Sequence, residues 1–420
     1  MNPVLSLAIA CVALLSACDP APACDAADLR ALEVPVAYAV VTSDYISTAV
    51  ALLDGDGELV DEAWVDSGTT RAGIAASLSG DVVLPTEGLA GRLTLLDRFG
   101  VDLLTLIAVP EGTVLAQVPT QLAREDSPSG FRANPHDVVE LEDGLALVSR
   151  YGVNVNVDAP PLDRGNDVVL VNLTTSELLG RFDFAHLDVA VGGTIAFARP
   201  ERMARVGERV VVGLGRLDRS FMTSAPGAVA VLDPASGEVT AVPLEGLAGC
   251  GEVRRVPGDA ERVMVLCSGT WTPDSEARRA SVGVASVHVT ADGAVAVEHL
   301  WRAAEHGEVP VPYGVVVPLG GARVALASTG SLAPQVPARA FVLDLATGAW
   351  RDVVTDAGPF ALGPGTFDPG TGLLLLPDSE LGIRRFRSPG GLELVELPTS
   401  PVSPCRGLQA REVGALVAAP

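Results

Sequence analysis

The sequence predicts an all-β fold, a β-propeller, and three observations lead to this prediction. From about residue 35 to the end, short Val-rich runs alternate with turns rich in Gly, Pro, Asp and Ser, a pattern typical of β-strands. No long segment has the periodicity of a helix. A strand–turn–strand unit recurs along the chain, and such recurrence indicates a repeat architecture.

The composition is that of a folded protein with an acidic surface. The chain has 420 residues, of which 48% are hydrophobic but only 4% aromatic, and its formal net charge is −23. This aliphatic content can bury a large core, which excludes general disorder. The excess of acidic residues argues against nucleic acid as a partner, because phosphate binding needs clustered basic side chains.

The N-terminal residues predict export. Residues 4–15 form an apolar run that is too short to span a bilayer as a helix but suits a signal peptide. The run ends in Leu-Ser-Ala-Cys, which resembles a bacterial lipobox with Cys18 as the acylated residue. We therefore expect residues 1–17 to be a lipoprotein signal peptide and residues 18–34 a lipidated tether. The protein would be lipid-anchored in the cell envelope, facing the periplasm or the cell surface. An ordinary signal peptide with a nearby cleavage site is the alternative.

The recurring unit consists of an apolar strand, in most copies an Asp or Asn, a turn and a second strand. Its seven copies are residues 49–60, 93–104, 168–179, 229–239, 285–297, 340–350 and 383–395. Asp or Asn at a strand end accepts hydrogen bonds from turn amides, and Gly supplies the positive φ that many such turns need. The unit therefore reads as a β-hairpin.

A second hairpin precedes several of these copies. Its examples are residues 134–148, 200–212, 252–266 and 312–326. Two hairpins give four strands, which is the unit of a propeller blade. Seven units predict one seven-bladed propeller over residues 35–420, with six or eight blades as alternatives. Residues 409–418 read as a strand, and its pairing with the first strands around residues 36–42 would close the ring.

Four cysteines remain for disulfides once those of the signal peptide and the lipidation site are set aside. Cys24, Cys250, Cys267 and Cys405 allow three pairings. Two strand-like runs between Cys250 and Cys267 flank a Pro-Gly-Asp turn, and centring the turn on residues 258–259 places these two cysteines directly opposite, within disulfide reach. Cys24 would then pair with Cys405 and join the two ends of the chain. Four free thiols are the alternative, which an oxidising compartment disfavours.

Two of the repeats also carry a resemblance to a known family. The copies around Asp233 and Asp344, of the form V-x-V-x-D-x-x-T/S-G-x-V, resemble the repeats of YVTN/YncE-like propellers. The segments 134–137, 149–152, 200–203 and 216–219 are similar to those of exported bacterial propeller lipoproteins of this type. The resemblance covers about residues 35–420. It implies the propeller fold and, because members of the family are mostly uncharacterised, no particular activity.

Residues that open each inner hairpin should lie around one mouth of the central channel. The polar and aromatic candidates there are Arg71, His136, Asp137, Glu201, Arg202, Glu252, Tyr313 and Phe360. Polar groups gathered at a mouth would form a pocket of the kind that binds ligands. His136 beside Asp137 is the best acid–base candidate, although adjacent strand residues point to opposite faces. The alternative is that these side chains satisfy turn amides and one another.

Other motifs point to no cofactor and no metal site. The five histidines lack metal-ligand spacing, and Gly213-Leu214-Gly215 precedes no helix, so it is not a dinucleotide site. The sequence contains neither a Gly-x-Ser-x-Gly elbow nor a Walker loop.

Two functional hypotheses follow. The favoured one is a monomeric, non-catalytic propeller that binds a protein, peptide or glycan partner and touches the membrane only through its lipid anchor. The alternative is a propeller enzyme, either a metal-dependent lactonase or other hydrolase, or a lyase, that uses the channel mouth. The metal-dependent version predicts a divalent ion near His136, Asp137, Glu201 and Glu252.

Overall fold

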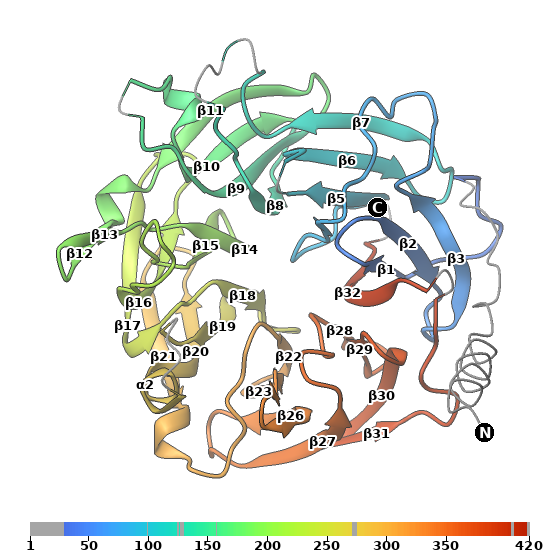
Figure 1. The fold of residues 1–420 in the computed structure, drawn as a ribbon, viewed down its shortest axis with the longest axis vertical. Coiled ribbons are helices and arrows are strands. Elements are labelled where there is room, and N and C mark those ends of the chain that lie inside the picture. Colours follow the sequence, from blue (N-terminus) through green and yellow to red (C-terminus); the bar gives the residue numbers. More distant parts are fainter. Residues whose placement is uncertain are drawn as a thin grey trace, which may run out of the picture.

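We describe the computed structural model of the chain over residues 29–98, 100–123, 126, 130–156, 158–270, 275–404 and 407–417. Seven four-stranded antiparallel sheets stand around a central axis as the blades of a β-propeller (Figure 1). This arrangement confirms the predicted fold class and blade number.

In the first four blades, the strands follow one another from the channel outwards in the order of the sequence. The exception is the innermost strand of blade 1, which comes from the C-terminal part of the chain. Blade 1 contains β32 (Gln409–Ala415), β1 (Tyr38–Ser43), β2 (Thr48–Leu53) and β3 (Leu59–Asp66). Blade 2 contains β4 (Val82–Val83), β5 (Arg92–Asp97), β6 (Leu103–Ala108) and β7 (Val114–Pro119). Blade 3 contains β8 (Pro135–Glu140), β9 (Leu145–Val153), β10 (Gly165–Asn172) and β11 (Glu177–Asp183). Blade 4 contains β14 (Pro200–Val206), β15 (Arg209–Leu214), β16 (Pro226–Leu232) and β17 (Val239–Ala248).

The remaining three blades complete the circle. Blade 5 contains β18 (Glu252–Arg255), β19 (Arg262–Ser268), β20 (Val282–Val289) and β21 (Val295–Arg302). Blade 6 contains β22 (Val316–Gly320), β23 (Arg323–Ser328), β26 (Ala338–Asp344) and β27 (Trp350–Ala357). Blade 7 contains β28 (Thr366–Asp368), β29 (Leu373–Asp378), β30 (Gly382–Gly390) and β31 (Glu393–Glu396).

Short elements decorate the connections between these strands. They are the hairpins β12 (Val189–Val191) with β13 (Thr194–Ala196) and β24 (Ser331–Leu332) with β25 (Gln335–Val336), the helix α2 (Ser275–Ser281), and the 3-10 turns η1 (Pro161–Asp163), η2 (Ala185–Leu187) and η3 (Ala303–Glu305). None of the helices in the described part of the chain is long and apolar enough to cross a membrane.

The repeats found in the sequence correspond to hairpins of the blades. Six of the seven copies are the outer hairpin of a blade, as residues 229–239 are in β16 and β17. The copy at residues 93–104 differs, because it covers β5 and β6, which are the second and third strands of blade 2. The second repeat forms inner hairpins, such as β14 with β15.

The ring closes as the sequence predicts. β32 is the inner strand of blade 1 and pairs antiparallel with β1, with Tyr38 opposite Ala415 and Ser43 opposite Gln409. Both ends of the chain therefore share one sheet, and closure leaves no free edge between the first and last blades.

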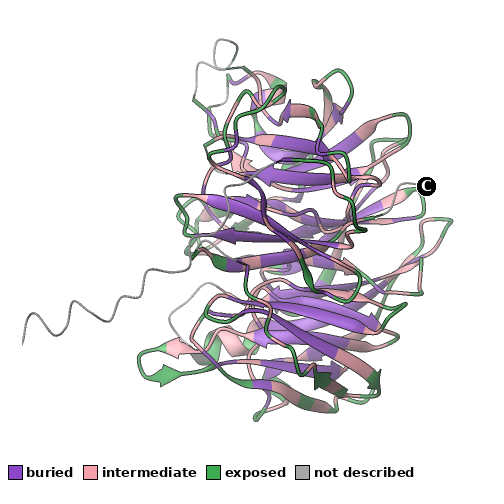
Figure 2. Ribbon diagram, turned by 90° about the vertical axis from the view of Figure 1, so that its right-hand side faces the viewer, coloured by how far each residue is buried: buried purple, intermediate pink, exposed green. Residues whose placement is uncertain are grey.

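The core lies between the blades. Every residue of β2 is buried, because one face of the strand packs on blade 7 and the other on blade 2. The same holds at the contact of blades 4 and 5, where Val211 and Val229 meet Val253 and Val265. Burial is therefore deepest in the middle strands of the blades (Figure 2). Strands covered on both sides need Val, Leu and Ala at nearly every position.

A disulfide joins Cys250 to Cys267, as the sequence predicts. The predicted register is one residue wrong, because Glu252 pairs with Leu266, which places Gly251 rather than Cys250 opposite Cys267. Cys250 instead exchanges two backbone hydrogen bonds with Leu214 of blade 4. Cys18, Cys24 and Cys405 lie outside the described residues, so the lipidation site and the second disulfide remain predictions.

Candidate functional site

The inner strands all begin at the same end of the channel, which we call the upper mouth, and end at the other, the lower mouth. Antiparallel blades that follow one another with the same topology impose this direction on β8, β14, β18, β22 and β28. First residues of inner strands and the turns before them therefore gather at the upper mouth. Glu201 and Glu252 are both of this kind.

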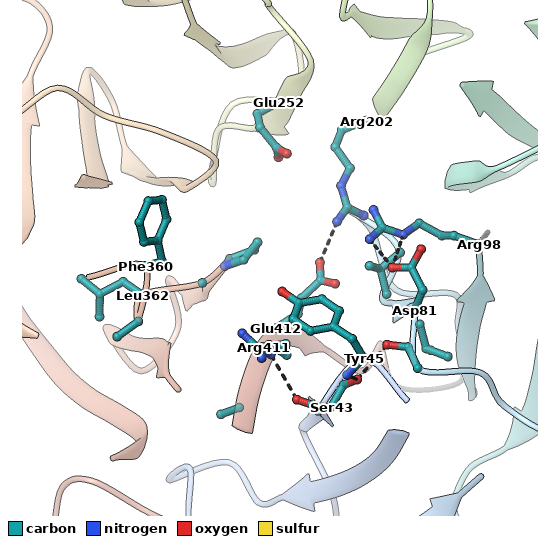
Figure 3. A pocket seen from close by; sticks show the side chains of 17 residues that line it. Ser43, Tyr45, Asp81, Arg98, Arg202, Glu252, Phe360, Leu362, Arg411 and Glu412 are labelled. Carbon is teal, nitrogen blue, oxygen red and sulfur yellow. Dashed lines mark hydrogen bonds and ion pairs between the residues drawn. The ribbon is translucent and has the colours of Figure 1, made fainter. Parts of the chain in front are cut away.

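Two cavities open at the upper mouth. The central cavity, of about 280 Å³, lies among Tyr45, Arg98, Phe360 and the pair Arg202 and Glu412 (Figure 3). The side cavity has a volume of about 420 Å³ and is bounded by residues of blades 3 to 6. Its lining comprises Tyr151, Glu201, Gly215, Leu217, Phe221, Gly249, Gly251, Glu252, Ser268, Gly269, Tyr313 and Gly314. Glu252 lines both cavities, so they adjoin each other.

An ion pair crosses the channel below the central cavity. Arg202 Nη2 lies 2.9 Å from Glu412 Oε1, and both side chains are buried. Arg202 Nη1 donates to the carbonyls of Leu84, at 2.7 Å, and His136, at 3.2 Å. Burial alone would lower the pKa of Arg202, but the surrounding carboxylates, led by Glu412, raise it overall. Arg202 therefore stays charged and ties blade 4 to blades 1, 2 and 3.

Asp137 has a structural environment. Its carboxylate accepts hydrogen bonds from the backbone amides of Met203, at 2.7 Å, and Thr86, at 2.8 Å. Burial raises the pKa of Asp137, while Arg202 and these hydrogen bonds oppose the rise. The side chain thus joins blade 3 to blade 4 and to the segment after β4. These contacts fit the alternative interpretation of the sequence, in which the candidate side chains accept hydrogen bonds from backbone amides and do not bind a ligand.

His136 turns toward the aromatic residues of the site and not toward Asp137. Its ring stacks on Tyr151 with 4.5 Å between the ring centroids. Burial, followed by the positive charges of Arg98, Arg202 and Arg199, lowers the pKa of His136 well below its usual value. The imidazole is therefore neutral at physiological pH. The two neighbours do not form the acid–base pair that was the leading candidate in the sequence.

Glu201 and Glu252 are the two acids of the side cavity. Burial, reinforced by the charge of Glu252, raises the pKa of Glu201 to about 8. Burial also raises the pKa of Glu252, against the effect of Arg202. Glu252 Oε2 is buried without a hydrogen-bond partner among the described residues. Such an atom is costly unless a ligand or water satisfies it.

Two glycines make room for the Glu201 carboxyl group. A Cβ atom at Gly215 would lie 2.4 Å from Glu201 Oε1, and one at Gly251 would lie 2.2 Å from Glu201 Oε2. Neither distance is tolerated by non-bonded atoms. Any larger residue at Gly215 or Gly251 would therefore displace the carboxyl group.

Aromatic rings form another part of the lining of the side cavity. Tyr151 and Phe221 are parallel, with 6.3 Å between their centroids, and Tyr313 contributes from the turn before β22. The Arg199 guanidinium lies 4.8 Å from the Tyr151 centroid and 4.4 Å from that of Phe221. Arg278 lies 4.8 Å from the Tyr313 centroid. Each tyrosine pKa is raised, chiefly by burial, so both hydroxyls stay protonated.

The other predicted candidates are distributed unevenly. Phe360 lines the central cavity and is 56% exposed. Arg71 is exposed in the connection between β3 and β4 and lines neither cavity. Within the described part of the chain there is no group of three or more His, Cys, Asp or Glu that could hold a metal ion. His136, Asp137, Glu201 and Glu252 therefore do not converge as the metal-dependent hypothesis requires.

Several residues of the site were missed from the sequence. Tyr151, Gly215, Phe221 and Gly251 line the side cavity, yet all lie in connections or at strand ends. The only signal was indirect, since residues 149–152 and 216–219 adjoin the cavity and were among the segments that resemble propeller lipoproteins.

Comparison with known proteins shows the fold alone. No family model matches the chain, and no curated protein matches it. The periplasmic gluconolactonase PpgL of Pseudomonas aeruginosa superposes with a TM-score of 0.55 and 16% identity, over 92% of this chain and 99% of that one. The β-propeller domain of Cps50 (Swd1) from Myceliophteria thermophila gives 0.52 and 11%, over 86% and 99%. A functionally unknown protein of Desulfotomaculum acetoxidans gives 0.51 and 11%, over 91% and 100%.

Proposed function

We propose that this propeller binds a small polyhydroxylated ligand, such as the end of a glycan, in the side cavity of the upper mouth. One observation carries the proposal: the carboxyl groups of Glu201 and Glu252 and the aromatic rings of Tyr151, Phe221 and Tyr313 line one cavity of about 420 Å³. Carboxyl oxygens can accept hydrogen bonds from sugar hydroxyls, while the ring of Phe221, which is 44% exposed, can pack against the apolar face of a sugar ring. A cavity of this volume suits a small molecule better than a protein surface.

The charges around the cavity disfavour a cationic ligand. Arg199 and Arg278 already lie over the rings of Tyr151, Phe221 and Tyr313. A cationic ligand or a lysine-rich peptide would meet like charge at these faces, where a cation would otherwise bind. A glycan is therefore the preferred member of the protein, peptide and glycan partners.

We also propose that the protein is exported and lipid-anchored at Cys18. The lipobox-like segment and the apolar run before it support this address. The propeller would then present its binding site within the cell envelope.

Binding can be tested by saturation-transfer NMR and calorimetry on the purified chain with glucose, galactose, mannose and N-acetylglucosamine. At least one sugar should bind. Phe221→Ala should weaken it by about fivefold, the effect of losing one aromatic contact. Phe360→Ala is the matched control, because Phe360 is another exposed aromatic residue of the same mouth that does not line the side cavity. Absence of binding by all four sugars, or equal losses in both variants, would contradict the proposal.

Hydrolysis of a sugar lactone is a second candidate, favoured by the state of Glu201. With a pKa of about 8, this carboxyl group can exchange a proton near neutral pH, as general acid–base catalysis requires. The structurally similar P. aeruginosa protein is named a periplasmic gluconolactonase. As a base, Glu201 would take a proton from the water that attacks the lactone carbonyl, and it would return this proton to the ring oxygen as the ring C–O bond breaks.

The same preparations decide between binding alone and hydrolysis. If Glu201 is the base, glucono-δ-lactone should open faster than it does spontaneously, and the enzymatic rate should rise with pH up to about 8. Glu201→Gln should then abolish the excess rate. A rate equal to the spontaneous one leaves the binding function alone.

A further inference from the structure

A third, larger cavity lies at the lower mouth, at the opposite end of the channel. Its volume is about 680 Å³. Arg254 and Arg255 at the end of β18 line it on one side, and Thr86 and Glu87, in the segment after β4, on another. None of these residues lines the upper cavities, whereas Arg202 and Glu412 line the central one. The lower mouth is thus a separate compartment.

Polar atoms without partners gather at this mouth. Thr86 Oγ1, Glu87 Oε1 and Arg254 Nε are all buried and have no hydrogen-bond partner among the described residues. A buried polar atom that is left without a partner destabilises the protein. All three belong to residues that line one cavity, and donors and acceptors are both represented, which indicates a place where a ligand can supply missing partners.

The charged groups of the cavity are close together but incompletely paired. Arg255 Nε lies 3.7 Å from Glu87 Oε1, beyond hydrogen-bond distance, and the Arg255 side chain is 45% exposed. Arg254 Nη1 makes one long contact, of 3.4 Å, to the carbonyl of Thr86. The Arg255 guanidinium therefore lies near the Glu87 carboxyl group, and the Arg254 guanidinium lies near the neighbouring carbonyl of Thr86.

The environment of Glu87 makes the site receptive to an anion. Burial raises the pKa of Glu87 to about 7, with Asp137 raising it further and Arg255 and Arg205 opposing. Near neutral pH the carboxyl group is therefore only partly ionised, and the two arginines dominate the local charge. The remaining wall is apolar and includes Phe367.

We propose that the lower mouth binds a small organic acid that carries a hydroxyl or amino group next to its carboxylate. Arg254 and Arg255 donate to the carboxylate, the neighbouring group donates to Glu87 Oε1, and an apolar substituent packs on Phe367. Adjacent groups of one molecule match these partners, because the guanidinium of Arg255 and the carboxyl of Glu87 are less than 4 Å apart. The site is independent of the sugar site at the upper mouth.

Calorimetry on the purified full chain tests this site with 2-hydroxy-3-phenylpropanoate as the probe. Two analogues dissect it: 3-phenylpropanoate lacks the hydroxyl group, and inorganic phosphate supplies only the anion. The hydroxy acid should bind, and 3-phenylpropanoate should bind about tenfold more weakly, the effect of one hydrogen bond to a charged group. Phosphate should bind more weakly than either.

Variants locate the site. Arg254→Gln should weaken the probe at least about tenfold, because it removes one charge-assisted hydrogen bond. Glu87→Met removes the acceptor, so the variant should bind the hydroxy acid and 3-phenylpropanoate equally. Arg351→Gln is the control, since it makes the same charge change on the exposed outer strand β27 and should leave binding unchanged. Melting temperatures of all variants establish that they are folded.

Several outcomes overturn the proposal. The first is that the probe does not bind at millimolar concentration. The second is that the wild-type protein binds 3-phenylpropanoate or phosphate with the same affinity as the probe. The third is that Arg254→Gln weakens binding no more than Arg351→Gln does. Sugar binding at the upper mouth is a separate measurement, so the absence of binding at one mouth says nothing against binding at the other.

Discussion

At the scale of single residues, the centre of this ring is occupied by charged side chains, although its blades are held together by aliphatic ones. Asp137 and Arg202 are nearly inaccessible to solvent, and each is held by hydrogen bonds to backbone groups of other blades. Glu201 and Glu252 differ, because their carboxyl groups face a cavity. The first two side chains hold blades together, and the second two are available for a ligand.

The raised pKa of Glu201 predicts a pH-dependent stability. In the unfolded chain this group releases its proton near its ordinary value of 4.5, whereas in the folded protein it does so at about 8. The folded protein binds more protons between these values, so its stability falls as the pH rises from about 4.5 to about 8. The Glu201→Gln variant has no titrating group at this position, so it should not lose this stability as the pH rises. The melting temperature of the variant should match that of the wild type at pH 4.5 and exceed it by a few degrees at pH 8.5.

Thermal unfolding at the two pH values checks this prediction. Glu208→Gln is the control, because the Glu208 side chain is 87% exposed in the turn after β14. It should behave like the wild type at both pH values. A difference between Glu201→Gln and wild type that does not change with pH would show that the proton of Glu201 is not responsible.

At the level of secondary-structure elements, each blade is a pair of hairpins, and short segments connect one blade to the next. Between blades 4 and 5 the chain passes through Gly249, Cys250 and Gly251 before β18 begins. Cys250 is fixed to blade 4 by its backbone hydrogen bonds with Leu214 and to blade 5 by the disulfide with Cys267. Gly251, beside it, borders the Glu201 carboxyl group. The disulfide therefore holds in place the segment around Cys250, whose neighbours Gly249 and Gly251 line the side cavity.

Loss of this disulfide should destabilise the protein. The bond closes a loop with a sequence separation of 17 residues, for which the chain-entropy model gives about 3 kcal/mol. Cys250→Ser/Cys267→Ser should lower the melting temperature, and adding a reductant to the wild type should lower it comparably. The same reductant should have no further effect on the double variant. A double variant as stable as the wild type would mean that the bond does not constrain the unfolded chain.

At the scale of the whole molecule, the ring is held by its circumference and also across its centre. The pairing of β32 with β1 closes the circumference. The pair Arg202 and Glu412 connects blade 4 with blade 1 through the channel, and Leu84 of the segment after β4 joins it through both its carbonyl and its amide. The pair therefore couples blades that are not neighbours in the ring, as the contacts of Arg254 and Arg255 with Thr86 and Glu87 do between blades 5 and 2.

Breaking the pair should therefore destabilise the fold. Arg202→Gln leaves Glu412 buried without its charge partner, which typically costs about 3–5 kcal/mol. Arg205→Gln in the same strand removes a pair with the exposed Glu208 and hydrogen bonds to the carbonyls of Gly207 and Glu140, so it should cost less than Arg202→Gln. Chemical denaturation of both variants measures the difference. Adding Glu412→Gln to Arg202→Gln should restore part of the loss, and equal losses for Arg202→Gln and Arg205→Gln would contradict this role.

The propeller architecture could be predicted from the sequence alone. Strand, turn and repeat are local properties, since Val-rich runs and Asp–Gly turns specify hairpins wherever they occur, and seven copies specify the ring. The closing strand was also predictable, because residues 409–418 read as a strand with no other partner in the repeat. The register at Cys250 was not, because the backbone pairing of Cys250 with Leu214 of the preceding blade shifts it by one residue.

The side chains that form a site could be identified only from the three-dimensional structure. His136 and Asp137 are adjacent in sequence, yet one joins the aromatic cluster and the other binds amides, because neighbouring strand residues face opposite ways. Glu201, Tyr151 and Tyr313 come from three blades and meet only because the ring brings those blades to one mouth. A strand pattern depends on residues a few positions apart, whereas a cavity depends on the curvature and closure of the entire chain.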